Sequence, residues 1–143
     1  EYWRRPDETA ASFAGEWFLT GDSAEMDAAG YIRYHGRTDD IMNAQGYRVS
    51  PSEVETTLLT FPEITEVAAI ELPVREGVSI IAACIVGVPD DDRAQAILAH
   101  CQQNLARYKC PKAVIWLDAL PRSANGKILR RKLIQDHGWR PVE

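Results

Sequence analysis

A short glycine-bounded stretch, Gly36–Arg48, holds the densest set of residues that could bind a charged ligand. Arg37 and Arg48 carry planar guanidinium groups that can each grip phosphate or sugar oxygens, and two aspartates lie between them. Gly36 and Gly46 allow backbone turns and a close ligand approach that a side chain would prevent. A solvated hairpin with scattered charges is the competing interpretation. The stretch alone does not decide between the two.

Asp22 and Lys127 are two further residues with possible chemistry. Asp22 follows Thr20-Gly21 at a corner, where it either caps a bend or accepts hydrogen bonds from the two vicinal hydroxyls of a ribose. Gly126-Lys127 is not a phosphate-binding P-loop, because the GxxxxGK[ST] frame is absent and Ile128 replaces the hydroxyl residue. Lys127 is therefore either an ordinary surface lysine or a mobile lysine that stabilises negative charge developing on a phosphate and a carboxylate.

The overall charge of the chain restricts the kind of partner. The 143 residues carry a formal net charge of -5, with 45% hydrophobic and 26% charged residues, as in an ordinary globular protein. The negative net charge argues against a nucleic-acid partner. Basic residues gather between Arg122 and Lys132, and this local positive charge fits a small polyanionic ligand better than a duplex.

The cysteines and the apolar runs indicate a cytoplasmic protein. Cys84, Cys101 and Cys110 are odd in number and lack CxxC spacing, so we expect reduced thiols and no metal site. Cys84 lies in an apolar run and is expected in the core. The longest apolar run, Ile80–Val88, is too short to span a bilayer, so no transmembrane segment is expected.

The elements before residue 36 are expected to be one helix and one hairpin. Residues 6–14 predict a short helix with Asp7 as N-cap, which Gly15 ends. Residues 16–20 and 31–35 are expected to pair as the strands of a hairpin, with a turn at 27–30 and the Asp22 corner partway along it.

From residue 51 onward, the pattern predicts helix, strand, strand, helix, strand, helix, which indicates a small sheet with helices packed on it. Ser50 is expected as N-cap of the first helix, with Glu53 reaching back in a capping box and Pro62 ending the helix. Strands are expected at 64–72, 79–88 and 113–117, and the last helix is expected to follow Gly126.

Three segments of this chain, Trp17–Asp22, Gly36–Glu55 and Leu120–Arg131, resemble motifs of the adenylate-forming, AMP-binding superfamily. That superfamily includes acyl-CoA synthetases, peptide-synthetase adenylation domains and luciferases, and the motifs occur here in the family's order. The resemblance implies an α+β fold: a small lid domain with a three-stranded sheet packed by helices, preceded by a β-hairpin tail of a large N-terminal domain. Residues 1–39 are expected to be that tail, ending at a hinge, and residues 40–143 the lid.

The resemblance implies a two-step acid–thiol ligase reaction: ATP activates a carboxylic acid as an acyl-adenylate, and the thiol of CoA then displaces AMP. Lys127 would be the catalytic adenylation lysine. The motif positions also imply ATP or AMP binding by Asp22, Arg37 and Arg48. Asp39 would be the hinge about which the lid rotates, and Gly46 would line the pantetheine tunnel for CoA.

The implied partners are a small carboxylic acid, ATP, CoA and the upstream N-terminal domain, with Mg²⁺ bound mainly by that domain. A lysine acetyltransferase acting on Lys127 is a further expectation, since acylation would remove its charge. A fragment without the upstream domain is expected to be inactive.

Sub-family signals favour a short- or medium-chain or aryl acyl-CoA ligase. Leu129 precedes Arg130, where peptide-synthetase domains more often have an acidic residue, and Asn43 occupies a position that is lysine in many relatives. Two alternatives stay open: an adenylation domain that loads a carrier-protein thiol, and an interaction module without catalysis.

Overall fold

The chain folds into two compact units, Glu1–Asp39 and Asp40–Glu143. The computed structural model describes residues 2–44 and 46–139. The unit boundary lies beside Asp39, the residue expected to be the hinge. The assignment of the units to a domain tail and a lid stays a prediction.

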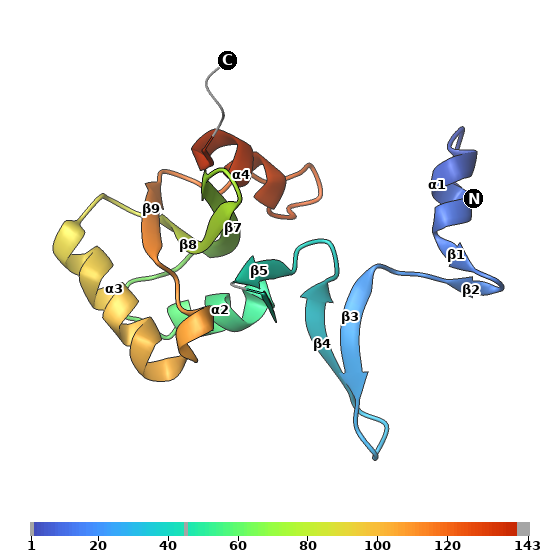
Figure 1. The fold of residues 1–143 in the computed structure, drawn as a ribbon, viewed down its shortest axis with the longest axis horizontal. Helices are drawn as coiled ribbons and strands as arrows, with labels where there is room; N and C mark the ends of the chain where they lie inside the picture. The colour runs from blue at the N-terminus through green and yellow to red at the C-terminus, as the bar shows by residue number, and fades with distance from the viewer. Residues whose placement is uncertain (1, 45, 140–143) are drawn as a thin grey trace. The chain divides into compact units, whose positions relative to one another are not determined.

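The first unit consists of one short helix and two β-hairpins (Figure 1). Its elements are α1 (Pro6–Ala11), β1 (Phe13–Ala14), β2 (Trp17–Phe18), β3 (Asp22–Met26) and β4 (Ile32–Arg37). Strand β1 pairs with β2, and β3 pairs with β4, both antiparallel.

The predicted pairing of residues 16–20 with 31–35 was wrong. Strand β2 turns back onto β1 instead, because Gly15 adopts a φ of +64° and the rings of Phe13 and Phe18 meet edge to face at 5.4 Å. The long hairpin therefore begins at Asp22. The prediction of Asp7 as N-cap was also wrong, since Arg5 occupies the N-cap position and Asp7 lies in the first turn.

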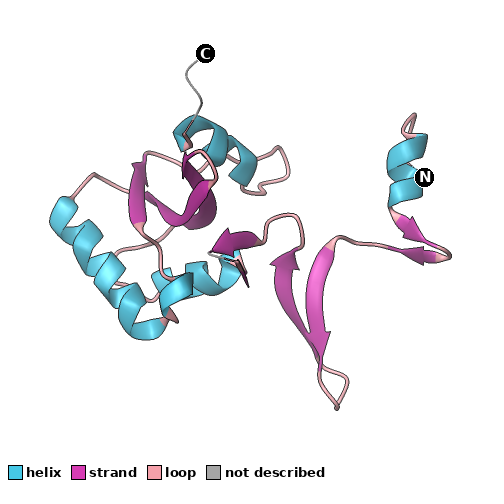
Figure 2. Cartoon of the chain, viewed as in Figure 1, coloured by secondary structure: helices cyan, strands magenta, loops and turns pink. Residues whose placement is uncertain are grey.

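The second unit contains the predicted sheet and helices (Figure 2). Its elements are β5 (Met42–Ala44), β6 (Tyr47–Val49), α2 (Pro51–Leu58), β7 (Val67–Arg75), β8 (Val78–Val86), α3 (Asp91–Asn104), the 3₁₀ helix η1 (Arg107–Lys109), β9 (Ala113–Leu117) and α4 (Arg130–His137). The sheet order is β7-β8-β9, with β8 antiparallel to β7 and parallel to β9. The α+β prediction of a three-stranded sheet packed by helices is confirmed.

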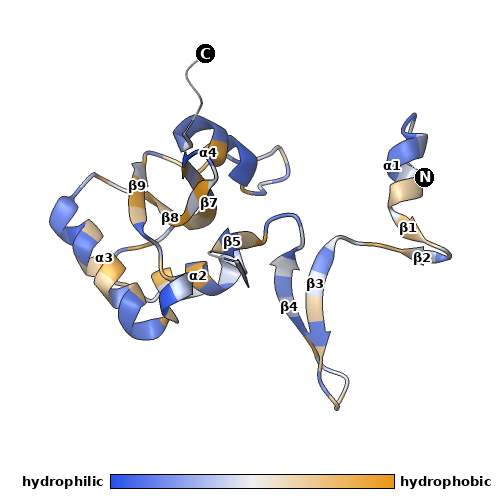
Figure 3. Cartoon of the chain, in the orientation of Figure 1, coloured by the Kyte–Doolittle hydropathy of each residue, from blue (hydrophilic) through white to orange (hydrophobic). Residues whose placement is uncertain are grey.

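Two clusters of buried apolar side chains cover the two faces of this sheet, which explains why apolar residues dominate its strands (Figure 3). On β8, Ala83 and Ile85 belong to the cluster that includes Ile97 of α3. Ala82 and Cys84 alternate with them and belong to the cluster that includes Leu133 of α4. Cys84 is fully buried, as predicted.

Two details of the helices differ from the prediction. Ser50 is the N-cap of α2 but makes no capping hydrogen bond through its side chain, and Glu53 forms an ion pair with Lys109 of η1. Helix α4 begins only at Arg130, because Ile128 forms a β-bridge with Arg122. No helix in the described ranges is long and apolar enough to cross a membrane.

Candidate functional site

Asp22 and Arg37 lie opposite each other at the end of the β3–β4 hairpin. Arg37 donates from Nη1 to the carbonyl of Thr20 at 2.7 Å and reaches the Asp22 carboxylate at 3.5 Å. The hydroxyl of Thr38 donates to the carbonyl of Gly21 at 2.7 Å. The corner before β3 is thus tied to the residues after β4, and Asp22 is held with its side chain 38% exposed.

Asp39 forms an ion pair with the same arginine, Arg37. Nε of Arg37 donates to its carboxylate at 3.2 Å, and this hydrogen bond, followed by the negative charge of Asp39, raises the pKa of Arg37. The structure therefore brings together three of the predicted site residues, Asp22, Arg37 and Asp39, within the first unit.

Gly21 makes this arrangement possible. Its φ is +73°, a conformation that L residues rarely adopt. A Cβ at this position would lie 2.9 Å from Nη2 of Arg37. Glycine therefore suits the backbone turn, and a side chain at this position would also displace the guanidinium of Arg37.

Lys127 is presented by a closed loop between β9 and α4. The loop is held by the Arg122–Ile128 bridge, by the N–H of Ser123 bonded to the carbonyl of Lys127 at 2.8 Å, and by the N–H of Leu129 bonded to the carbonyl of Pro121 at 2.8 Å. Gly126 turns the chain with a φ of +79°. The Lys127 side chain is exposed and forms no ion pair with any residue that the structure describes.

Gly46 and Arg48 lie on another element of the second unit, the β5–β6 hairpin. Gly46 has a φ of +87°, and no atom of the described residues beyond its chain neighbours lies within 4 Å of where its Cβ would be. Arg48 is exposed and stands opposite Asn43. The two residues share one hairpin, while Lys127 belongs to a separate loop.

An additional polar cluster surrounds Arg130 at the start of α4. Its guanidinium donates to Asp40 at 3.2 Å and to Glu55 at 2.7 Å. Arg130 is 20% exposed, and Glu55 also accepts the N–H of Ala69 of β7 at 2.9 Å. Sequence reasoning missed this cluster. Asp40 and Arg130 are 90 positions apart, and no local pattern signals their pairing.

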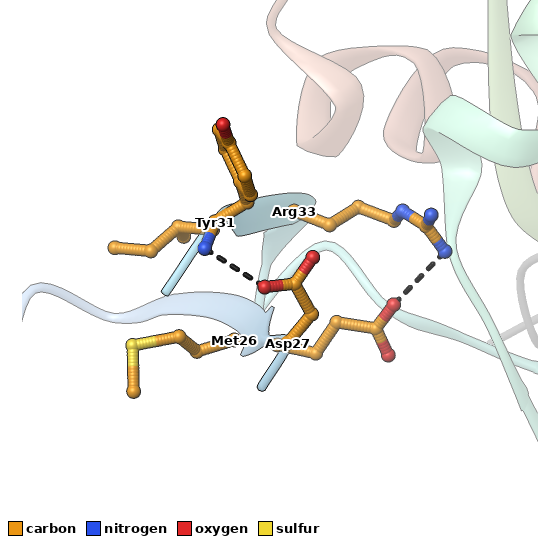
Figure 4. A pocket seen from close by; sticks show the side chains of 6 residues that line it. Met26, Asp27, Tyr31 and Arg33 are labelled. Atoms are coloured by element: carbon orange, nitrogen blue, oxygen red, sulfur yellow. Dashed lines mark hydrogen bonds and ion pairs between the residues drawn. The ribbon is translucent and has the colours of Figure 1, made fainter. Parts of the chain in front are cut away.

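Each unit contains a pocket among its described residues. The first, of about 480 Å³, lies at the tip of the β3–β4 hairpin, where Asp27 accepts the N–H of Tyr31 and Arg33 pairs with Glu25 (Figure 4). None of the predicted site residues lines it.

The second pocket, of about 370 Å³, lies beside the β5–β6 hairpin. Ala44 of β5 contributes to it, together with the cations of Arg107 and Lys112. The ring of its lining residue Tyr108 stacks on Tyr47 at 4.4 Å. No motif in the sequence marks these residues.

The chain resembles several curated acyl-CoA ligases. It is 39% identical to a long-chain-fatty-acid–CoA ligase of Mycobacterium tuberculosis, over 96% of this chain and 27% of the relative. It is 37% identical to a 3-hydroxybenzoate–CoA ligase of Aromatoleum sp., over 92% of this chain and 26% of the relative. The chain thus spans about a quarter of these relatives, in their C-terminal part.

Solved structures of adenylate-forming enzymes share the fold. An anthranilate CoA ligase in complex with anthranoyl-AMP matches with a TM-score of 0.86 and 35% identity, over 95% of this chain and 27% of that chain. The o-succinylbenzoate CoA synthetase of Bacillus subtilis in complex with ATP and magnesium matches with a TM-score of 0.82 and 31% identity, over 93% and 27%.

A family model matches the chain directly. The AMP-binding enzyme C-terminal domain covers residues 53–127, a range that begins in α2 and ends at Lys127. This range is more than half of the 143 residues. The sequence motifs, the fold and the family model agree, and the chain belongs to the AMP-binding enzyme C-terminal domain family.

Proposed function

We propose that this chain is the C-terminal part of an AMP-forming acyl-CoA ligase, an acid–thiol ligase. The enzyme joins a carboxylic acid to ATP, releases pyrophosphate and forms an acyl-adenylate, whose AMP the thiol of CoA then displaces. Residues 1–39 end the large adenylation domain, and residues 40–143 form the lid. The names of the relatives support this proposal, although the chain spans only a quarter of their length.

The presentation of Lys127 carries the proposal. An exposed ammonium on a closed loop, without an ion-pair partner among the described residues, is free to approach a ligand. Such a cation can stabilise the negative charge that develops when a carboxylate oxygen attacks the α-phosphorus of ATP. We assign to Lys127 the role of holding the carboxylate and the α-phosphate together during adenylation.

Asp22 and Arg37 are proposed to bind the nucleotide. Asp22 accepts hydrogen bonds from the two ribose hydroxyls, since its carboxylate is held at the corner and partly exposed. Arg37 forms ion pairs with both Asp22 and Asp39, so we assign it the role of orienting the Asp22 carboxylate. Its remaining donors contact the ribose or phosphate.

The β5–β6 hairpin is proposed to serve the second half-reaction. The open space around Gly46 suits a backbone that lines a narrow tunnel for the pantetheine arm of CoA. Arg48 contacts phosphate. Lys127 and Gly46 lie on separate elements of one unit, and in this proposal rotation of the lid about the hinge Asp39 brings each in turn to a single reaction centre.

The proposed partners include two substrates of the ligase reaction, ATP and CoA. Relatives of this fold have been solved with ATP and with acyl-AMP. Among the described residues, no group of three or more His, Cys, Asp or Glu side chains is placed to hold a metal, so we assign no Mg²⁺ ligand here. Acetylation of Lys127 and a cytoplasmic location are also proposals.

The test is pyrophosphate release by the full-length enzyme with a panel of carboxylic acids, each assayed with and without CoA. An acid-dependent release followed by CoA thioester formation is expected. Release without any thioester would reject the CoA ligase and favour loading of a carrier protein. No release with any acid, from an enzyme that still binds ATP, would favour a non-catalytic module.

A further inference from the structure

Arg130 connects Asp40, the residue after the proposed hinge, to helices α2 and α4 of the second unit. Its two terminal nitrogens reach different carboxylates, Asp40 at 3.2 Å and Glu55 at 2.7 Å. The three side chains are 20%, 31% and 15% exposed, in that order, so water only partly screens the ion pairs. Glu55 in turn holds β7 through the N–H of Ala69. Asp40 is therefore fixed to α2, α4 and β7 at once.

The same arginine stands directly behind the Lys127 loop. Arg130 is the first residue of α4 and follows Lys127 by three positions. The N–H of Leu129 bonded to Pro121 closes the loop immediately before it. The chain from Lys127 to Arg130 is thus short and held at its end, so the position of Arg130 constrains where the loop presents Lys127.

We propose that Arg130 is a positioning residue: it fixes the position of the Lys127 loop relative to Asp40, the first residue after the hinge. The inference rests on the proposed function, since it assigns Lys127 to adenylation. A lid that rotates about Asp39 carries Lys127 to the reaction centre accurately only if the first residue beyond the hinge is fixed to the Lys127 loop. The Asp40–Arg130 pair provides this connection, across 90 positions of sequence.

The other half-reaction depends less on this pair. Gly46 follows Asp40 within six residues, and its hairpin has separate anchors: the N–H of Asn43 donates to Glu71 of β7 at 2.7 Å, and Met42 is buried. Loss of the Arg130 contacts should therefore displace Lys127 more than Gly46. Arginine suits the position, because a planar fork can bridge two carboxylates, whereas a lysine ammonium is a point charge.

Arg93 provides a matched control. It is a half-buried arginine of the same unit, 27% exposed, which pairs with Glu63 at 3.5 Å and stacks on Trp116 at 4.5 Å. Like Arg130, it has a buried Nε with no hydrogen-bond partner in the part of the chain that the structure describes. It lies on α3, whose main contacts are with α2 and β9. Arg93→Gln therefore tests the loss of a comparable arginine that does not connect the hinge to the Lys127 loop.

The experiment measures both half-reactions of the full-length enzyme: acyl-adenylate formation, and thioester formation from supplied acyl-adenylate. Arg130→Gln is expected to slow adenylation by roughly 10- to 100-fold, the cost of a misplacement of about 1 Å, and to slow thioester formation several-fold less. Arg130→Lys should fall between wild type and Arg130→Gln. Arg93→Gln should leave the ratio of the two rates unchanged.

A second measurement needs no catalysis. Amide hydrogen exchange of residues 40–44 should become faster in Arg130→Gln and in the milder variant Asp40→Asn, but not in Arg93→Gln. An unchanged rate ratio together with unchanged exchange in Arg130→Gln would overturn the inference. A wild-type enzyme that forms no acyl-adenylate would overturn the proposed function instead, and the exchange rates would still decide whether Arg130 anchors the hinge.

Discussion

Gly21→Ala is the sharpest perturbation of the proposed nucleotide site. An alanine at a φ of +73° costs about 1–2 kcal/mol in backbone strain. Its Cβ would also lie 2.9 Å from Nη2 of Arg37. Ordinary contact begins at about 3.5 Å, so the guanidinium must move by roughly 0.6 Å. That shift moves the group that orients the Asp22 carboxylate.

Gly30→Ala is the matched control, since Gly30 has a φ of +87° and, apart from its chain neighbours, no described residue lies within 4 Å of its Cβ position. It carries similar backbone strain in the same hairpin without touching Arg37. Both variants should lower the unfolding temperature of the full-length enzyme by similar amounts. Because a misplacement of 1 Å can cost about 100-fold, we expect a shift of about half that size to raise the KM for ATP roughly tenfold in Gly21→Ala.

The assay is pyrophosphate release at varied ATP concentration and saturating carboxylic acid. Gly30→Ala should stay within about twofold of the wild-type KM, since its strain is not coupled to the site. Equal KM values in the two variants would refute the reasoning. In that case the contact between Gly21 and Arg37 would not govern nucleotide binding.

The other predictions concern the lid and the core. Lys127→Ala should slow adenylation by about 100-fold or more but spare thioester formation from supplied acyl-adenylate; equal losses would contradict its role. Asp39→Pro should trap one lid orientation because proline fixes φ, so survival of both half-reactions at normal rates would reject the hinge. Lys127→Gln, which mimics acetylation, should also stop adenylation, and full activity would exclude such a switch. Burial raises the pKa of Cys84 to about 12, so its contribution to stability is complete below pH 9 and is lost as pH rises toward 12. The free energy of unfolding should therefore fall less steeply above pH 9 in Cys84→Ala than in wild type, and parallel slopes would contradict this.

Much of the second unit could be predicted from sequence because its signals are local. The strand at 113–117 was predicted with its observed bounds, and the apolar strands at 64–72 and 79–88 were displaced by only a few residues. Ser50 was predicted as N-cap, since serine followed by proline marks a helix start. These signals depend on periodicity and on single residues, and packing on both sheet faces agrees with them.

The strand pairing of the first unit was harder to predict from sequence, because its short strands can pair in more than one way. Residues 16–20 have the composition of a strand, but composition does not choose a partner. The choice depended on the turns at Gly15 and Gly21 and on the contact of Phe13 with Phe18.

The sequence by itself determined the family, the α+β class and the motif positions of Lys127, Asp22 and Gly46, because these follow from residue types in a fixed order. Only the tertiary structure decided which groups meet. It joined Arg37 to the Asp22 corner and Arg130 to Asp40 and Glu55. The physical reason is that an ion pair between residues far apart in sequence leaves no local pattern. The register of β3 against β4 brings Asp22 to Arg37, and the packing of α2 and α4 on β7 brings Asp40 and Glu55 to Arg130.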